Sequence, residues 1–367
     1  MLSDAAARFT FEPSTAPVPA EARALSLADP GFGRVFTDHM ALVRYSADRG
    51  WHDASVEARR PFVLDPSAAV LHYAQEIFEG LKAYRRPGGR AALFRPDANA
   101  RRFQESARRM AMPELPADIF LESIRAVVRA ERAWIPEGPD GALYLRPFMI
   151  ASEAFLGVRP AGEYLYAVIA SSVGPYFKGG AKPVSVWVTR DYIRAAPGGT
   201  GAAKCGGNYA ASLAAQAEAI RNGCDQVVFL DAIERRWVEE LGGMNIFFVL
   251  DGGTLVTPPL GGTILAGVTR DSILTLAGDM GLPVREEPYS IDNWAADAAS
   301  GRLSECFACG TAAVVTPIGR VQGAGIDFAI GANGDEAGPV TRRLRDALVG
   351  IQRGERPDPY GWIEDLD

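Results

Sequence analysis

The sequence has few histidines, no long apolar run and no excess of positive charge. Its three histidines are His39, His52 and His72. No two of them have the i, i+4 spacing of helical metal ligands, so we expect no histidine-based metal site. The absence of a run of about 18 apolar residues, and of a basic start followed by an apolar stretch, excludes a transmembrane helix and a signal peptide from our expectations. A net charge of −7 argues against nucleic-acid binding, which needs a basic surface.

The four cysteines are too few for a disulfide scaffold, which suits a reducing, cytoplasmic location. They are Cys205, Cys224, Cys306 and Cys309. The last two form a CxxC pair, but no second pair lies nearby in the sequence. We therefore interpret them as two reduced, partly buried thiols on a strand.

Length and composition are those of an ordinary globular protein with more than one domain. Apolar residues make up 48% and charged residues 23% of the sequence. Its length of 367 residues is enough for two or three domains. The first half predicts an α+β arrangement, and the second half alternates strands and helices as α/β proteins do. The turn-rich residues 174–182 form a predicted interdomain loop between a smaller domain at 31–173 and a larger one at 183–367. Residues 1–30 are predicted to form an N-terminal arm over the surface.

Hydrophobic periodicity predicts the elements of both halves. We expect strands at 36–45, 69–84, 143–150, 164–173, 183–190, 225–231, 236–241, 244–250, 303–309 and 312–321. We expect helices at 97–112, 118–134, 209–222, 268–279, 291–300 and 338–352. Asp118 is the predicted cap of the second helix. The near-continuous apolar run at 164–173 predicts a strand that is buried on both faces.

The segment Pro197–Tyr209 carries the most unusual pattern in the chain, with Lys204 among five glycines and two alanines. Small neighbours let the backbone approach a ligand closely. No carboxylate flanks Lys204, so its amine can lose a proton and attack a carbonyl carbon. A flexible loop with an exposed lysine is the alternative that the pattern alone leaves open. The segment matches neither the GxxxxGK[ST] loop nor GxGxxG, which disfavours a nucleotide site.

Glu239 and Glu240 stand together at the end of a predicted strand, before a glycine turn. Neighbouring strand residues point to opposite faces, so one carboxylate is expected to face the interior. A buried carboxylate needs a cationic partner, and the protonated nitrogen of a cofactor ring would serve. The residues alone do not say which of the two faces inward, and both could lie at the surface.

Three further features could hold a phosphate group. The helix expected from Val268 follows Gly267, and free N–H groups at a helix start bind phosphate, although an ordinary helix start has the same pattern. Thr311 lies in a turn of small residues. Arg102 offers a guanidinium group, or simply belongs to a solvated helix face. A nucleophilic lysine, a carboxylate for a ring nitrogen and phosphate donors together point to pyridoxal 5′-phosphate.

The segment His72–Lys82 is predicted on a strand, where Tyr73 could present its hydroxyl at a pocket mouth and Phe78 could be core. With three other segments it resembles the branched-chain amino acid aminotransferases, class IV pyridoxal-phosphate enzymes of fold type IV. The other segments are Phe36–Met40, Gly198–Tyr209 and Glu240–Asn245. The resemblance runs from Phe32 to Trp362. It implies a smaller N-terminal α/β domain and a larger, cofactor-binding C-terminal pseudo-barrel domain.

The resemblance also implies a role for each candidate residue. Lys204 would be the catalytic residue and hold the cofactor in a Schiff base. Tyr209 would donate a hydrogen bond to the phenolic oxygen of the ring, and Glu240 would keep the ring nitrogen protonated. The phosphate would be held by Arg102, Val268, Thr269 and Thr311. The substrate would be bound by Phe32, Phe78, Tyr144, Thr311 and Ala312, with Tyr73 and Arg146 from the partner subunit of a homodimer.

The activity that the resemblance implies is reversible, ping-pong transfer of the amino group of leucine, isoleucine or valine to 2-oxoglutarate, giving branched 2-oxo acids and L-glutamate. Mammalian members carry a redox CxxC where Ala313 and Thr316 stand, so no such switch is implied here. Gly243 replaces a hydroxyl residue of some members. A D-amino acid aminotransferase or an aminodeoxychorismate lyase of the same fold is an alternative, and a non-catalytic pyridoxal-phosphate-binding module is a more remote one.

Overall fold

A computed structural model describes residues 9–176, 182–331 and 334–366, and the chain divides into two compact units. Unit 1 comprises Met1–Tyr176, Ala203–Gly206 and Ile351–Asp367, and unit 2 comprises Phe177–Ala202 and Gly207–Gly350. Residues 1–8 of the expected arm and 177–181 of the expected interdomain loop lie outside the described residues. The domain limits expected from the sequence, at 31–173 and 183–367, stay a prediction.

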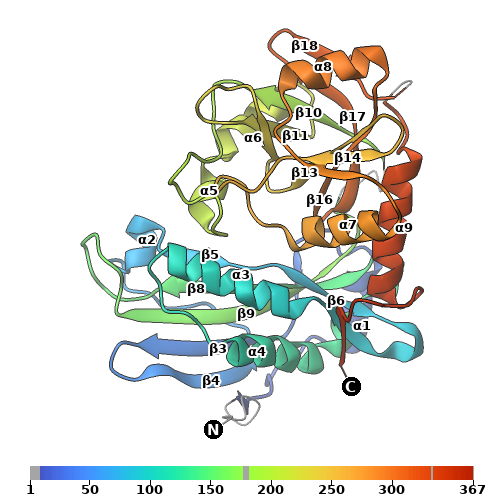
Figure 1. Ribbon diagram of the computed structural model, residues 1–367. Coiled ribbons are helices and arrows are strands. Elements are labelled where there is room, and N and C mark those ends of the chain that lie inside the picture. Colours follow the sequence, from blue (N-terminus) through green and yellow to red (C-terminus); the bar gives the residue numbers. More distant parts are fainter. Residues whose placement is uncertain (1–8, 177–181, 332–333, 367) are drawn as a thin grey trace. The chain divides into compact units, whose positions relative to one another are not determined.

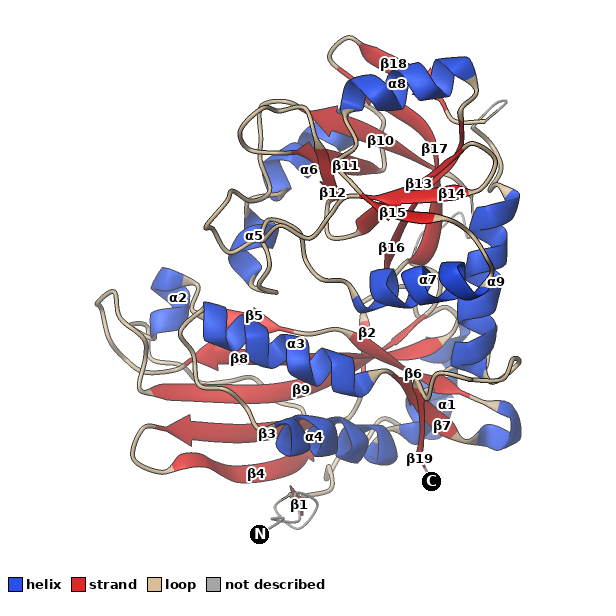
Figure 2. Cartoon of the chain, in the orientation of Figure 1, coloured by secondary structure: helices blue, strands red, loops and turns tan. Residues whose placement is uncertain are grey.

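Unit 1 is built on a ten-stranded sheet (Figure 2). Its strands are β1 (Thr10–Phe11), β2 (Val35–Phe36), β3 (His39–Ser46), β4 (Gly50–Ala58), β5 (Glu76–Phe78), β6 (Leu81–Arg85), β7 (Ala91–Phe94), β8 (Ala142–Ala151), β9 (Glu163–Val173) and β19 (Ile363–Leu366). Their order is β1-β4-β3-β9-β8-β6-β7-β19, with β2 also paired to β9 and β5 to β8. The β1–β4 pair is parallel, and the central β3–β9 and β8–β9 pairs are antiparallel.

The core of unit 1 lies between this sheet and two of its helices. The helices are α1 (Ala20–Ala28), α2 (Ala69–Tyr73), α3 (Pro96–Arg109) and α4 (Ala117–Ala130). Figure 1 shows α3 and α4 side by side, and α4 lies against β3 and β9. Phe103 of α3 and Phe120 of α4 are fully buried, with ring centroids 5.3 Å apart. Tyr166 of β9 packs against both rings, so β9 is buried on both faces as its apolar run predicts.

Unit 2 is built on a nine-stranded mixed sheet. Its strands are β10 (Val184–Thr189), β11 (Gln226–Leu230), β12 (Val238–Leu241), β13 (Asn245–Leu250), β14 (Thr254–Thr257), β15 (Val284–Glu286), β16 (Leu303–Gly310), β17 (Val314–Gly323) and β18 (Ile326–Ala329). Their order is β12-β11-β10-β17-β16-β13-β14-β15, with β18 paired to β17. Strand β10 is parallel to both neighbours, and β14 is parallel to β15.

Unit 2 also contains helices, some of which pack on strands of its sheet. They are α5 (Gly206–Ala210), α6 (Leu213–Arg221), α7 (Val268–Asp279), α8 (Ile291–Ser300) and α9 (Pro339–Arg353), of which α9 continues into unit 1. Ala215 and Ala219 of α6 pack on Val227 and Phe229 of β11. Within residues 9–176, 182–331 and 334–366, no helix is both long enough and apolar enough to cross a membrane.

Most predicted elements are confirmed, but the strand expected at 69–84 is wrong. Residues Ala69–Tyr73 form α2, and two short strands, β5 and β6, follow it. Ala74 takes a left-handed φ of 47°, and its N–H donates to the carbonyl oxygen of Val70. This C-cap ends the helix and turns the chain before β5, and the strand-like composition of the segment hides it.

Two helix boundaries also differ from the prediction. Asp118 is not the cap of α4, because the helix begins at Ala117 after Pro116, and Asp118 lies in the first turn, where its charge suits the helix dipole. The helix expected at 209–222 is divided into α5 and α6. At the division, the hydroxyl of Ser212 donates to the carbonyl oxygen of Tyr209 at 2.7 Å, which competes with helical bonding.

Candidate active site

Lys204 lies in a four-residue segment that belongs to unit 1, although the residues on either side of it belong to unit 2. Ala203 and Cys205 are buried in the core of unit 1. Lys204, between these two residues, is half-buried. Its Nζ atom lies 5.0 Å from the centroid of the Phe78 ring. The lysine therefore lies between two buried residues and is not fully exposed.

Arg102, a predicted phosphate ligand, is held by the fully buried carboxylate of Glu79. Its Nε and Nη2 atoms donate to the two oxygens of Glu79 at 2.7 and 2.9 Å. Asn99 donates to the same carboxylate at 2.7 Å. Burial alone would raise the pKa of Glu79, but the charges of Arg102 and Lys204 hold it below its usual value. Arg102 is only 7% exposed, so it does not belong to a solvated helix face.

Phe78, Tyr144 and Arg146 form a stacked group in unit 1. The guanidinium carbon of Arg146 lies 4.7 Å from the ring centroid of Phe78 and 5.3 Å from that of Tyr144. Its Nη2 atom donates to the Tyr144 hydroxyl at 3.1 Å. The ring of Phe32 packs edge-on against Tyr144, with centroids 5.2 Å apart. Four residues that the sequence analysis predicts for substrate binding are therefore brought together.

Tyr73 is the predicted substrate residue of unit 1 that lies apart from this group. It ends α2, is 38% exposed, and has its ring centroid 6.2 Å from that of His72. The family resemblance assigns both Tyr73 and Arg146 to a neighbouring subunit's site. Within its own chain, Arg146 packs against aromatic rings.

In unit 2, Glu240 of β12 is the acid that faces the interior. Its side chain is 1% exposed, and one carboxylate oxygen lies 3.2 Å from Nε of Arg194 while the other accepts the N–H of Leu265. Arg194 is itself buried and donates to the carbonyl oxygen of Thr263 at 2.6 Å. The chain thus supplies one cation for this carboxylate. Sequence reasoning missed Arg194, since nothing in its local pattern marks it as a partner.

Glu239 points to the other face of β12 and is half-buried. Thr263 donates to its Oε1 atom at 2.6 Å. Its Oε2 atom is buried and has no hydrogen-bond partner in the part of the chain that the structure describes. Burial therefore raises the pKa of Glu239, although Thr263 and Arg194 partly oppose the shift.

Tyr209 lies on α5, where its ring closely approaches the glycine turn after β12. A Cβ atom on Gly243 would lie 3.1 Å from Cε1 of Tyr209, so glycine permits this approach. A second residue of α5 closes the glycine-rich loop. Thr200 donates to the side-chain oxygen of Asn208 at 2.7 Å, and Asn208 donates back to the carbonyl of Thr200 at 2.8 Å. The sequence analysis did not single out Asn208.

The start of α7 has the backbone geometry of an anion site. The N–H of Asp271 donates to the carbonyl oxygen of Gly267 at 3.0 Å. The N–H groups of Val268 and Thr269 precede that bond and have no acceptor within the helix. Thr269 is only 6% exposed. These two predicted residues could therefore hold a phosphate group.

The turn between β16 and β17 carries Thr311 and Ala312, which are both half-buried. Cys306 and Cys309 precede this turn on β16. Both are free thiols on a strand, as predicted, but they are fully and not partly buried, and burial raises the pKa of each. Neither thiol is therefore poised to react as a thiolate.

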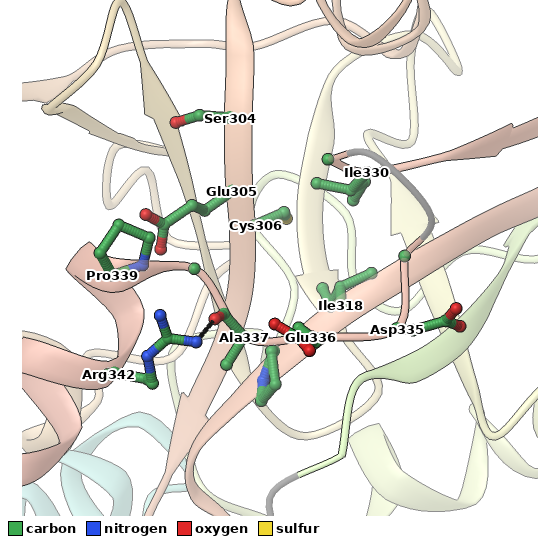
Figure 3. Close-up of a pocket in the computed structure, with 14 residues that line it drawn as sticks. Ser304, Glu305, Cys306, Ile318, Ile330, Asp335, Glu336, Ala337, Pro339 and Arg342 are labelled. Carbon is green, nitrogen blue, oxygen red and sulfur yellow. Dashed lines mark hydrogen bonds between the residues drawn. The ribbon is translucent and has the colours of Figure 1, made fainter.

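A cavity of about 540 Å³ in unit 2 has described lining residues that include none of those predicted for the site (Figure 3). Its buried carboxylate, Glu305, accepts the N–H groups of Val340 and Thr341 at 2.9 and 2.7 Å. Glu305 thereby caps the start of α9. We assign no part of the chemistry to this cavity.

Comparison with known proteins matches residues 76–321 to the family described as "Amino-transferase class IV". The chain is 58% identical over 357 residues to the probable branched-chain-amino-acid aminotransferase of Streptomyces coelicolor (strain ATCC BAA-471 / A3(2) / M145), covering 97% of this chain and 98% of the relative. It is also similar to two solved structures, each at 29% identity and a TM-score of 0.72.

One of these structures is the branched-chain amino acid aminotransferase from Escherichia coli, with 90% of this chain and 99% of that chain covered. The other is the T.th. enzyme of the same name with pyridoxamine 5′-phosphate, with 89% and 99% covered. These similarities confirm the predicted fold type IV architecture. The chain belongs to the class IV aminotransferases and, within them, to the branched-chain amino acid aminotransferases.

Proposed function

We propose that this chain catalyses the reversible transfer of the amino group of leucine, isoleucine or valine to 2-oxoglutarate, with pyridoxal phosphate as its cofactor. Family membership supports the type of reaction. The observation that carries the proposal is the placement of Lys204, a half-buried amine beside the Phe78 ring on a segment with buried neighbours.

The donor groups of the chain fit pyridoxal phosphate. When bound, this cofactor supplies an aldehyde for the transferred amino group and a protonated ring that draws electrons from the substrate's α-carbon. Glu240 offers a buried carboxylate, held by Arg194, for the ring nitrogen. The helix start at Val268 and Thr269 and the guanidinium of Arg102 suit the phosphate. We assign Tyr209 to the phenolic oxygen of the ring and Thr311 to the phosphate.

Lys204 is the proposed catalytic base. Once free, its Nζ atom would take the proton from the α-carbon of the amino acid and return it on the other side of the transferred nitrogen. The main chain at Lys204 is hydrogen-bonded to unit 1, whereas the lysine's four-carbon stem stays flexible. One amine can therefore reach the carbon on either side of the transferred nitrogen while its Cα atom stays in place.

The aromatic group of unit 1 suits a branched apolar side chain. Phe32, Phe78 and Tyr144 offer apolar surface, and Arg146 offers a cation for a substrate carboxylate, including the side chain of glutamate. We assign Ala312 and Thr311 to the same substrate, and Tyr73 to the substrate of a neighbouring subunit.

An absorbance spectrum of the purified holoenzyme, recorded before and after each amino acid is added, tests this function. We expect L-leucine, L-isoleucine, L-valine and L-glutamate to change the visible band, and D-alanine to leave it unchanged. A response to D-amino acids alone would favour the D-amino acid aminotransferase. Bound cofactor that responds to none of them, with no exchange of the α-proton of leucine for deuterium, would favour a non-catalytic binding module.

A homodimer and a cytoplasmic location complete the proposal. The dimer rests on the family resemblance, in which both subunits contribute to each site. The location rests on four cysteines that include no disulfide framework. Sedimentation of the purified protein and fractionation of the source cells test these two points.

A further inference from the structure

Three hydrogen bonds attach the main chain around Lys204 to elements of unit 1. The N–H of Lys204 donates to the hydroxyl of Ser106 at 3.0 Å. Its carbonyl oxygen accepts the N–H of Phe78 at 2.9 Å. Two residues later, the N–H of Gly206 donates to the carboxylate of Glu76. The backbone on both sides of the lysine is therefore anchored from outside its own segment.

The two side chains that serve as anchors belong to a helix and a paired strand of unit 1. Ser106 is 1% exposed on α3, beside the buried Phe103 and Ala107. Glu76 begins β5, the short strand that also carries Phe78 and pairs with β8. A Cβ atom on residue 206 would overlap the Glu76 carboxylate, so the glycine at this position permits the contact.

We propose that Glu76 and Ser106 are positioning residues that hold the main chain of Lys204, so that its amine swings from one fixed Cα position. This inference rests on the proposed function of Lys204. Neither residue is among those assigned above to cofactor or substrate, and both act through the lysine segment.

Directionality separates this role from simple anchoring of the segment. Burial of Ala203 and Cys205 already favours contact of the segment with the core of unit 1, but burial of apolar groups has no preferred direction. Hydrogen bonds are directional, so they fix the position and the orientation of the Lys204 backbone. Misplacing a reacting group by about 1 Å can cost about a hundredfold in rate, which makes this placement matter for catalysis.

The test compares Ser106→Ala and Glu76→Leu with the conservative Glu76→Gln, which keeps an acceptor oxygen. Glu163→Gln, an exposed carboxylate of the same sheet, is the matched control. Amide hydrogen exchange of the peptide containing residues 203–206 is measured in cofactor-free protein, and kcat and KM for leucine are measured in the holoenzyme. Thermal unfolding is followed for every variant.

We expect faster exchange of that peptide in Ser106→Ala and Glu76→Leu, and a fall in kcat of about tenfold or more with little change in KM. Glu76→Gln should stay close to the wild type in both measurements. Ser106→Ala removes a single oxygen atom, so it keeps the test decisive if Glu76→Leu does not fold.

Lower melting temperatures with unchanged exchange and unchanged kcat would overturn the inference, because the two side chains would then only stabilise the fold. Equal defects in Glu76→Gln and Glu76→Leu would overturn it for Glu76. Absence of a borohydride-trapped adduct on Lys204 of the wild type would instead refute the proposed function, and the inference with it.

Discussion

At the scale of single residues, the chain pairs the two charges proposed for its site, those of Glu240 and Arg102, with charges of its own. Glu240 is held by Arg194, and Arg102 by Glu79, and each of these four residues is at most 7% exposed. Burial of an unpaired charge costs free energy of folding. Each ion pair therefore lowers the cost of burying both of its members. Replacing either member of a pair should therefore affect both the proposed site and the stability of the folded chain.

Lys204→Ala should remove both the cofactor linkage and transamination. We expect activity to fall by about 10³-fold or more, because the nucleophile and the base are lost together. Borohydride reduction followed by mass spectrometry should find no pyridoxyl group on the 204 peptide. Lys182→Ala changes an exposed lysine and serves as the control, with activity and label retained. A label that persists on another lysine would contradict the assignment.

Glu240→Gln should lower kcat by about a hundredfold, because the ring nitrogen loses its anionic partner. The same change leaves the buried Arg194 without its counter-ion, which we expect to cost about 3–5 kcal/mol in the free energy of unfolding. Turnover assays and urea unfolding check the two effects separately. A folded variant with wild-type turnover would remove the proposed role of Glu240.

Glu239→Gln should change the melting temperature by an amount that depends on pH. The change should be a gain, opposite in sign to the loss of stability expected for Glu240→Gln. Because burial raises the pKa of Glu239 above its ordinary value of 4.5, the folded state binds this proton more tightly than the unfolded state does. Stability supplied by the protonated form is thus lost as pH rises through the raised pKa. Relative to wild type, the variant should gain in melting temperature from acidic to neutral pH. A gain in the opposite direction would contradict the shift.

At the scale of elements, most of the long periodic segments were predicted, and the shortest strands were not. Helices α7 and α8 begin and end where the sequence predicts them, since Gly267 and Ser290 mark their starts. Helix α1, the nine-residue strand β4 and the short edge strands β15 and β19 were not predicted. Strands of three or four residues show too little alternation to stand out, and their pairing depends on distant partners.

The cap of α9 offers a test at this scale. Glu305→Ala removes the acceptor of two N–H groups and of the Thr341 hydroxyl, so it should lower the free energy of unfolding by about 1–2 kcal/mol. Glu336→Ala, an exposed carboxylate at the same cavity, should leave stability unchanged. Denaturant unfolding measures both variants. We expect unchanged transamination in each, since the cavity has no assigned part in the chemistry.

At the scale of the whole molecule, the predicted site residues are distributed over both units. Lys204, Arg102 and the aromatic group belong to unit 1, and Tyr209, Glu240 and the start of α7 belong to unit 2. Near Lys204 the chain changes unit twice within a few residues, at Ala203 and again after Gly206. A local sequence pattern can mark such a segment, but it cannot say which unit holds it.

Mixing of inactive subunits tests whether a neighbouring subunit contributes to the site. Lys204→Ala refolded with Tyr73→Ala should recover activity, because the resemblance assigns Tyr73 to the partner. Lys204→Ala refolded with Arg146→Ala should not, because Arg146 stacks on Phe78 of its own chain. Recovery in the second mixture alone would reverse the two assignments.

By itself, the sequence predicted a reactive lysine, a pair of adjacent acids and a helix start for a phosphate, and with them the cofactor, because each is written in a short run of neighbouring residues. Only the tertiary structure decided that Glu240 faces inward onto Arg194, that Glu79 holds Arg102, and that Glu76 and Ser106 anchor Lys204. These partners are distant in sequence. They meet because packing of the sheets and helices brings their side chains within hydrogen-bonding distance. The hydrophobic periodicity of a short segment does not specify which distant residue will be its partner.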